Sequence, residues 1–81
     1  MELKDTLELM TSNDYKDRFR AEYWQTKIRY NKLFEIVTDY DIKKTSFNEP
    51  ANIKLFRKQA KAMLNYLDAL LTIAEIEKIK L

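Results

Sequence analysis

Residues 50–77, PANIKLFRKQAKAMLNYLDALLTIAEIE, carry the pattern that decides the fold. An apolar row runs through this stretch at spacings of 4, 3, 4, 3 and 4, through Phe56, Ala60, Met63, Leu67, Leu70 and Ala74. Heptad spacing of this kind is typical of the buried side of a long helix. Proline suits the first helical position because its missing N–H would be unpaired there, and Asn48 or Glu49 then supplies the cap. We therefore predict a helix over 50–77 and a tail over 78–81.

The residues before Pro50 predict a second long helix and a break between the two. Large side chains form a seam at heptad spacing through Phe19, Tyr23, Tyr30, Leu33, Val37 and Tyr40. Ser12, Asn13 and Asp14 are the candidate caps, because their side-chain oxygens accept the first backbone N–H groups of a helix. We place this helix at 13–41 and a loop at 42–49, a connection that suits an antiparallel hairpin.

The first ten residues predict a short third helix. Leu3, Leu7 and Met10 repeat at i, i+4 and i+7, which gives one apolar side over 1–10. Two turns are too few to be stable alone, so this segment must dock on something. We read 1–81 as a single all-α domain, a two-helix hairpin with a short N-terminal helix. A chain this small buries only about 60% of its unfolded surface, so we expect a homo-oligomeric helical bundle.

The composition excludes most classes of catalytic site. The 81 residues include no Gly, no Cys and no His. Without glycine there is no P-loop, dinucleotide-binding fingerprint or nucleophile elbow, and without cysteine there is no thiolate nucleophile or thiolate zinc site. The commonest general base and metal ligand, histidine, is also missing. No pair of carboxylates stands at catalytic spacing, so we expect no enzyme, no metal and no cofactor.

Charge is low overall but unevenly spread. The formal net charge is +2, which argues against a nucleic-acid binder. The positive charge is concentrated in residues 14–35 and in residues 50–67. No apolar run approaches the length of a membrane span, and the first residues have alternating charge where a signal peptide is apolar. We expect a cytoplasmic protein without membrane contact.

One basic cluster lies in the second predicted helix. Lys54, Arg57, Lys58 and Lys61 follow one helix face at i, i+3, i+4 and i+7, and no acid lies between Pro50 and Asp68. An anion-binding site is one interpretation of this face. The other is a solvated basic face, with Lys54 and Arg57 paired to Asp39 or Asp41 across the hairpin.

A second cluster mixes basic and aromatic residues in the first long helix. It comprises Arg18, Arg20, Tyr23, Trp24, Lys27 and Arg29. Aromatic rings stack on nucleobases and cations hold phosphates, so this composition fits a nucleotide contact surface. Tyr23 also belongs to the seam, which favours a core role. Trp24 lies off the seam, where contact with a partner or with a second copy is the alternative to ligand stacking.

Two stretches of the chain carry a family resemblance. They are YKDRFRAEYWQTKIRYNKL at residues 15–33 and a proline-started segment with Gln59, Met63, Tyr66-Leu67 and Ala74-Glu75-Ile76-Glu77. Over about residues 10–81 the chain resembles short phage and prophage proteins of gut bacteria related to a crAss-like phage gene product. That family is similar to the helical-hairpin domain of phage anti-CBASS and anti-Thoeris sponges. The chain departs from the family pattern in lacking glycine in the loop and before the C-terminal residues, and in nine extra N-terminal residues.

The resemblance implies a non-enzymatic phage protein of the host cytoplasm. Such a protein sequesters small anionic immune-signalling nucleotides, of cyclic oligonucleotide or ADP-ribose type, and so blocks host anti-phage defence. The ten basic and aromatic residues of the two clusters are then the expected ligand-binding set. The alternative is a helical protein-interaction module that binds and inhibits a host or phage protein without a small ligand. A nucleic-acid partner is the least favoured of the three.

Overall fold

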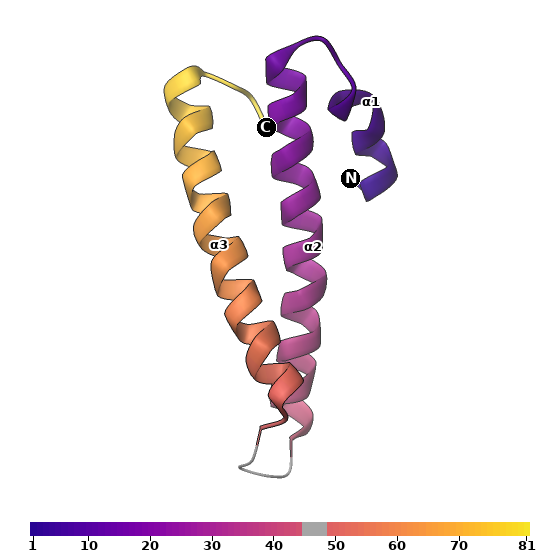
Figure 1. Ribbon diagram of the computed structural model, residues 1–81, viewed down its shortest axis with the longest axis vertical. Coiled ribbons are helices and arrows are strands. Elements are labelled where there is room, and N and C mark those ends of the chain that lie inside the picture. The colour runs from indigo at the N-terminus through magenta and orange to yellow at the C-terminus, as the bar shows by residue number, and fades with distance from the viewer. Residues whose placement is uncertain (45–48) are drawn as a thin grey trace.

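The computed structural model describes residues 1–44 and 49–81. Its elements are the 3-10 helix η1 (Leu3–Thr6) and the α-helices α1 (Leu7–Met10), α2 (Tyr15–Lys43) and α3 (Ala51–Glu77). Helices α2 and α3 form an antiparallel hairpin, and the N-terminal segment lies beside the first half of α2 (Figure 1). Within the described residues there is no strand. The predicted all-α hairpin is confirmed, and the homo-oligomeric bundle stays a prediction.

Side chains of the linker and first turn fix the start of α2. Asp14 is the cap, and its Oδ1 accepts a hydrogen bond from the Lys16 N–H at 2.9 Å. Ser12 supports it by accepting from the Asp14 N–H at 3.0 Å and donating to Asp17 at 2.8 Å. At the other end, α2 runs two residues past 41. Lys43 stabilises this extra length because it pairs with Asp39 one turn earlier, at 3.1 Å, and its charge opposes the helix dipole.

The start of α3 differs by one residue from the sequence expectation. Pro50 is the cap, in an extended conformation, and Ala51 is the first helical residue. The Pro50 carbonyl accepts hydrogen bonds from the N–H groups of Ile53 and Lys54, at 3.1 and 3.2 Å. Glu49, one of the two expected caps, instead accepts from Arg57, and Asn48 lies outside the described residues. Of the two candidate caps, Glu49 therefore does not cap this helix.

Leu33, Val37 and Ile53 are buried toward the loop end of the hairpin. The core cluster lies between α2 and α3 in the half that holds both chain ends. Its buried residues are Phe19, Tyr23, Leu67, Leu70, Ala74 and Ile79. Trp24, Tyr30 and Leu81 are partly buried against this cluster. Ile76, an apolar residue of α3 outside the core stripe, is 74% exposed. The hairpin therefore buries a narrower row than its apolar pattern suggests.

Thr6 joins the N-terminal segment to α2. Its side chain is 1% exposed, donates to the Leu3 carbonyl at 2.7 Å and accepts from the Gln25 amide at 2.9 Å. A buried hydroxyl without partners costs stability, so the Thr6 hydroxyl needs both bonds, and the one from Gln25 holds η1 against α2. The expected docking of residues 1–10 is confirmed. None of the described helices is long and apolar enough to cross a membrane.

The tail turns back onto α2 directly after α3 ends (Figure 1). Lys78 has the left-handed conformation, with φ 57° and ψ 44°, and the Ile79 N–H bonds to the Ala74 carbonyl at 2.8 Å. This is the turn that commonly ends helices, usually with glycine at the left-handed position. The turn buries Ile79, and the Arg20 Nε donates to the Lys80 carbonyl at 2.7 Å.

Candidate functional site

An open groove of about 260 Å³ lies between α2 and α3, between the core and the loop. Its lining residues are Tyr30, Phe34, Val37, Arg57, Ala60, Lys61 and Leu64. Tyr30 and Phe34 of α2 contribute aromatic rings, and Arg57 and Lys61 of α3 contribute positive charges. The groove therefore combines aromatic and basic side chains from two helices. We call it the interhelix groove.

The aromatic side of the interhelix groove is a stacked pair. The rings of Tyr30 and Phe34 are 5.8 Å apart between centroids and 30° from parallel. The Lys27 ammonium lies 5.7 Å from the Tyr30 centroid, within the range of a cation–π contact. Tyr30 is therefore engaged by its neighbours, whereas Phe34 is 53% exposed. Phe34 is the ring that a planar ligand can reach.

Arg57 is the more constrained of the two groove cations. Its guanidinium forms a two-pronged ion pair with Asp41 and also contacts Glu49, with 2.7 Å between Nε and Oε1. The guanidinium lowers the pKa of the Asp41 carboxyl, and the two carboxylates raise the pKa of Arg57. This cluster carries one more negative than positive charge, so it is a poor phosphate site. Of the pairings considered across the hairpin, that of Arg57 with Asp41 is present, whereas among the described residues Lys54 pairs with neither Asp39 nor Asp41.

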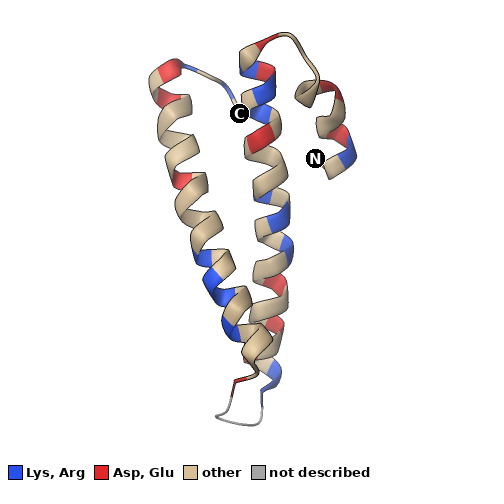
Figure 2. Ribbon diagram, viewed as in Figure 1, with Lys and Arg blue, Asp and Glu red and all other residues tan. Residues whose placement is uncertain are grey.

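Lys61 lies one turn beyond Arg57 and is exposed. Within residues 1–44 and 49–81 it makes no ion pair, and neither do Lys54 and Lys58. These lysines give the loop-side half of α3 its basic character (Figure 2). Of the three, Lys61 alone lines the interhelix groove, so its ammonium is the charge available to an anion there.

The remaining predicted ligand residues lie elsewhere. Arg18 donates to the Ser12 carbonyl at 2.8 Å, and Arg20 pairs with Asp17 at 3.0 Å. Tyr23 is 8% exposed, and its ring meets Trp24 edge-on at 5.1 Å. The side chains of these four residues therefore contact other residues of the same chain near its termini. Arg29 is exposed and lies outside the interhelix groove. Of the predicted set, the structure brings together Arg57 and Lys61 in the groove, and Lys27 lies over the ring of Tyr30, which also lines it.

The sequence pattern does not reveal the aromatic half of the groove. Tyr30 belongs to the core seam, and Phe34 stands one position past the seam residue Leu33. The available signal is their spacing of four residues, which places two rings side by side on a helix, with Tyr30 three residues after Lys27. The same spacing is also found for rings that simply pack in a core. Only the position of α3 shows that these two rings line a groove instead.

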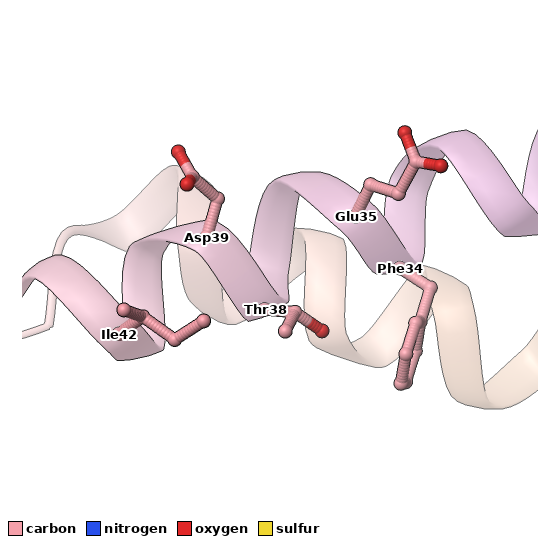
Figure 3. A pocket seen from close by; sticks show the side chains of 5 residues that line it. All are labelled: Phe34, Glu35, Thr38, Asp39 and Ile42. Atoms are coloured by element: carbon pink, nitrogen blue, oxygen red, sulfur yellow. The ribbon is translucent and has the colours of Figure 1, made fainter.

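Two further hollows fit an anion less well. The first, also about 260 Å³, lies on α2 around Phe34, Thr38 and Ile42 (Figure 3). Its other lining residues, Glu35 and Asp39, are both carboxylates, which repel an anion.

The second hollow, about 440 Å³, lies between the N-terminal segment and α2. It is lined by Met1, Glu2, Leu3, Lys4, Ile28 and Lys32. It has no aromatic ring, and its Lys4 pairs with Glu2 at 3.4 Å. Among the residues that the structure describes, no group of three or more carboxylates is placed to hold a metal ion.

Comparison with known proteins adds a family to this geometry. No curated protein and no solved structure matches the chain significantly. The model of the protein family described as Sequestin matches residues 13–72, which include all of α2 and most of α3. The matched region contains every residue of the interhelix groove, and by this match the chain belongs to the Sequestin family.

Proposed function

We propose that this chain is a non-enzymatic phage protein that sequesters small anionic immune-signalling nucleotides, of cyclic oligonucleotide or ADP-ribose type, in the host cytoplasm. It acts as a homo-oligomer, and holding the nucleotide away from its host receptor blocks anti-phage defence. The family name, Sequestin, refers to sequestering and supports the binding role.

The observation that carries the proposal is the pairing of Phe34 and Lys61 across the interhelix groove. The exposed Phe34 ring offers a surface on which a base stacks, worth roughly 1–3 kcal/mol per base. The Lys61 ammonium, which has no carboxylate partner among the described residues, is placed to meet a phosphate. Lys27 adds positive potential from the α2 side.

The size of the groove supports a site shared between copies. At about 260 Å³ it is smaller than the roughly 300–1,000 Å³ of typical small-molecule pockets. One copy therefore covers part of a cyclic dinucleotide, and a second copy covers the rest. Because the chain has no glycine, side chains from rigid helices must hold the phosphates instead of a loop of backbone amides.

Sequestering requires that the ligand leave unchanged. The groove holds one carboxylate-bound arginine, one lysine and two aromatic rings, and it contains no activated nucleophile or general base. A nucleotide bound there is protected, and its free concentration falls in proportion to the amount of protein. The defence signal is then lowered by mass action.

Calorimetry against cyclic dinucleotides, cyclic trinucleotides and cyclised ADP-ribose tests the proposal. We expect at least one of them to bind at micromolar protein, and Phe34→Ala and Lys61→Glu to weaken it at least roughly tenfold. Lys16→Glu is the control, since Lys16 is exposed and lies outside the groove. Mass spectrometry of the released ligand should show it intact. Absence of binding by every member of the panel overturns the proposal.

The α2 hollow in Figure 3 favours the alternative function, inhibition of a host or phage protein. Phe34 and Ile42 are 53% and 77% exposed there, and exposed apolar side chains of this size mark protein contacts. Pull-down from host lysate distinguishes the two functions. Under the alternative, a host protein is captured, Ile42→Glu abolishes the capture, and no nucleotide binds.

A further inference from the structure

Helix α3 carries a second heptad row that stays exposed to solvent, and of its members Tyr66 also donates a hydrogen bond to Glu22 of α2. Its spacing is 4, 3, 4, 3, 4 and 3, and its members are Leu55, Gln59, Ala62, Tyr66, Ala69, Ile73 and Ile76. None of the seven is charged and all are exposed, Leu55 by 64%, Ile73 by 40% and Ile76 by 74%. We call these residues the outer row, because they lie on a different side of α3 from the buried Leu67 and Ala74.

A sustained heptad row without charge is the pattern of a helix that packs against another helix. Over the 55–76 stretch it extends for roughly 32 Å, at 1.5 Å per residue. Ordinary solvent-facing rows of a helix contain charged residues, and α3 does carry Lys54, Lys58 and Lys61 on its other exposed side. The outer row is therefore an interaction surface.

We propose that the outer row pairs with the outer row of a second copy of this chain, with the two α3 helices antiparallel. The charges of α3 select this partner and this direction. Lys54 and Lys58, which form no ion pair among the described residues, lie in the first half of α3, and its acids Asp68, Glu75 and Glu77 all lie in the second half (Figure 2). Antiparallel copies place each basic half beside an acidic half, whereas parallel copies place like charges together.

The sizes of the side chains agree with the same arrangement. In an antiparallel register that sets Leu55 opposite Ile73 of the second copy, Ala62 falls opposite Tyr66 and Ala69 opposite Gln59. Each small residue then faces a larger one, which keeps the spacing of the helices even. The arrangement is two-fold symmetric, so every contact is made twice.

This pairing rests on the homo-oligomeric state proposed above but not on the ligand. The groove residues Lys61 and Leu64 lie on a different side of α3 from the outer row, so the copy paired through the outer row is not the copy that completes the interhelix groove, and each groove stays open to its ligand and to that further copy. Loss of pairing and loss of nucleotide binding are therefore separate results.

Sedimentation of the full chain tests the surface. We expect the wild type to be a dimer, or a multiple of one, at micromolar concentration, and Ala69→Glu or Ile73→Glu to raise the dissociation constant at least tenfold. Leu71→Glu is the matched control, because Leu71 is 45% exposed but outside the outer row, and it should leave the mass unchanged. Circular dichroism should show full helix content in all three variants. A monomeric wild type, or equal loss with Leu71→Glu, overturns the proposal.

Cysteine crosslinking tests the direction, since the chain has no cysteine of its own. Leu55→Cys and Ile73→Cys, refolded together and oxidised, should give a mixed disulfide dimer. Each variant alone should give none, because antiparallel packing separates identical positions by roughly 27 Å at 1.5 Å per residue. Crosslinks in each variant alone, with none in the mixture, would show parallel packing and refute this arrangement.

Discussion

At the terminal end of the hairpin Arg20 donates to the Lys80 carbonyl at 2.7 Å, whereas in the interhelix groove Lys61 has no carboxylate partner among the described residues. The same contrast holds for the aromatic residues. Tyr23 is 8% exposed inside the core, and Phe34 is 53% exposed on the groove. Cations and rings at the terminal end hold the fold together, whereas Lys61 and Phe34 of the groove remain available to a ligand. Substitutions at the terminal end should therefore change the free energy of unfolding, and substitutions in the groove should change nucleotide affinity.

The largest effect on stability is expected at Leu67, which is 2% exposed in the terminal core. Leu67→Ala leaves a cavity between α2 and α3 and should lower the free energy of unfolding by about 2–5 kcal/mol. Leu64→Ala is the matched substitution in the groove, where the side chain is 41% exposed, and should cost less than about 1 kcal/mol. Urea denaturation followed by circular dichroism measures both. Equal losses of unfolding free energy in the two variants would contradict the contrast between a packed terminal core and an open groove.

A smaller effect is expected at Arg20. Arg20→Gln removes the bond to the Lys80 carbonyl and the ion pair with Asp17, so the tail loses its attachment to α2. We expect a loss of about 1 kcal/mol, because the guanidinium is partly exposed. Nucleotide affinity should not change. Weaker binding at unchanged stability would instead return Arg20 to the ligand-binding set that the sequence indicated.

Lys78 offers a substitution that should stabilise the chain. A residue with a Cβ pays roughly 1–2 kcal/mol in the left-handed conformation, and glycine gives back part of this through its freer unfolded state. Lys78→Gly should therefore raise the free energy of unfolding by about 0.5–1 kcal/mol, seen as a higher melting temperature. Lys80→Gly, beyond the turn, is the control and should give no gain.

The sequence predicts the hairpin well because its signals are local and periodic. The seam through Phe19 and Leu67, the cap at Asp14 and the break before Pro50 each follow from spacing or from backbone chemistry. Helix α2 ends at Lys43 instead of the predicted residue 41. The reason is that the pair of Lys43 with Asp39 is a weak local contact, which rules for helix ends do not capture.

The candidate site is less predictable because it depends on which faces meet. Arg18 and Arg20 look like phosphate ligands in the sequence, but the linker and the tail, distant in the chain, supply carbonyls that occupy them. In the sequence Phe34 is indistinguishable from the other apolar residues of its helix. Only the packing of α3 against α2 brings Lys61 into the same groove. A periodic pattern predicts which residues share a face, but long-range packing determines what that face meets.

The smallest effect concerns two phenols that join α2 to α3. Tyr66 donates to Glu22, and Tyr15 donates to Glu77 at 3.1 Å. Each carboxylate stabilises the protonated phenol, so both pKa values lie above 10.0. Because the folded pKa is raised, these bonds contribute fully below about pH 10 and are lost as the pH rises through the folded pKa. Glu22→Gln should lower the pKa of Tyr66 toward 10.0 and leave that of Tyr15 unchanged, as read from phenolate absorbance.

Dilution turns this titration into a test of the outer row. Tyr66 belongs to the row and loses water when two copies pair, which raises the pKa of a phenol further. Tyr15 lies outside the row and serves as the internal reference. At low protein concentration Tyr66 should titrate at lower pH than at high concentration, while Tyr15 titrates at the same pH in both. A concentration-independent Tyr66 would mean that its ring faces water in every state of assembly, and the contact between copies would have to lie elsewhere.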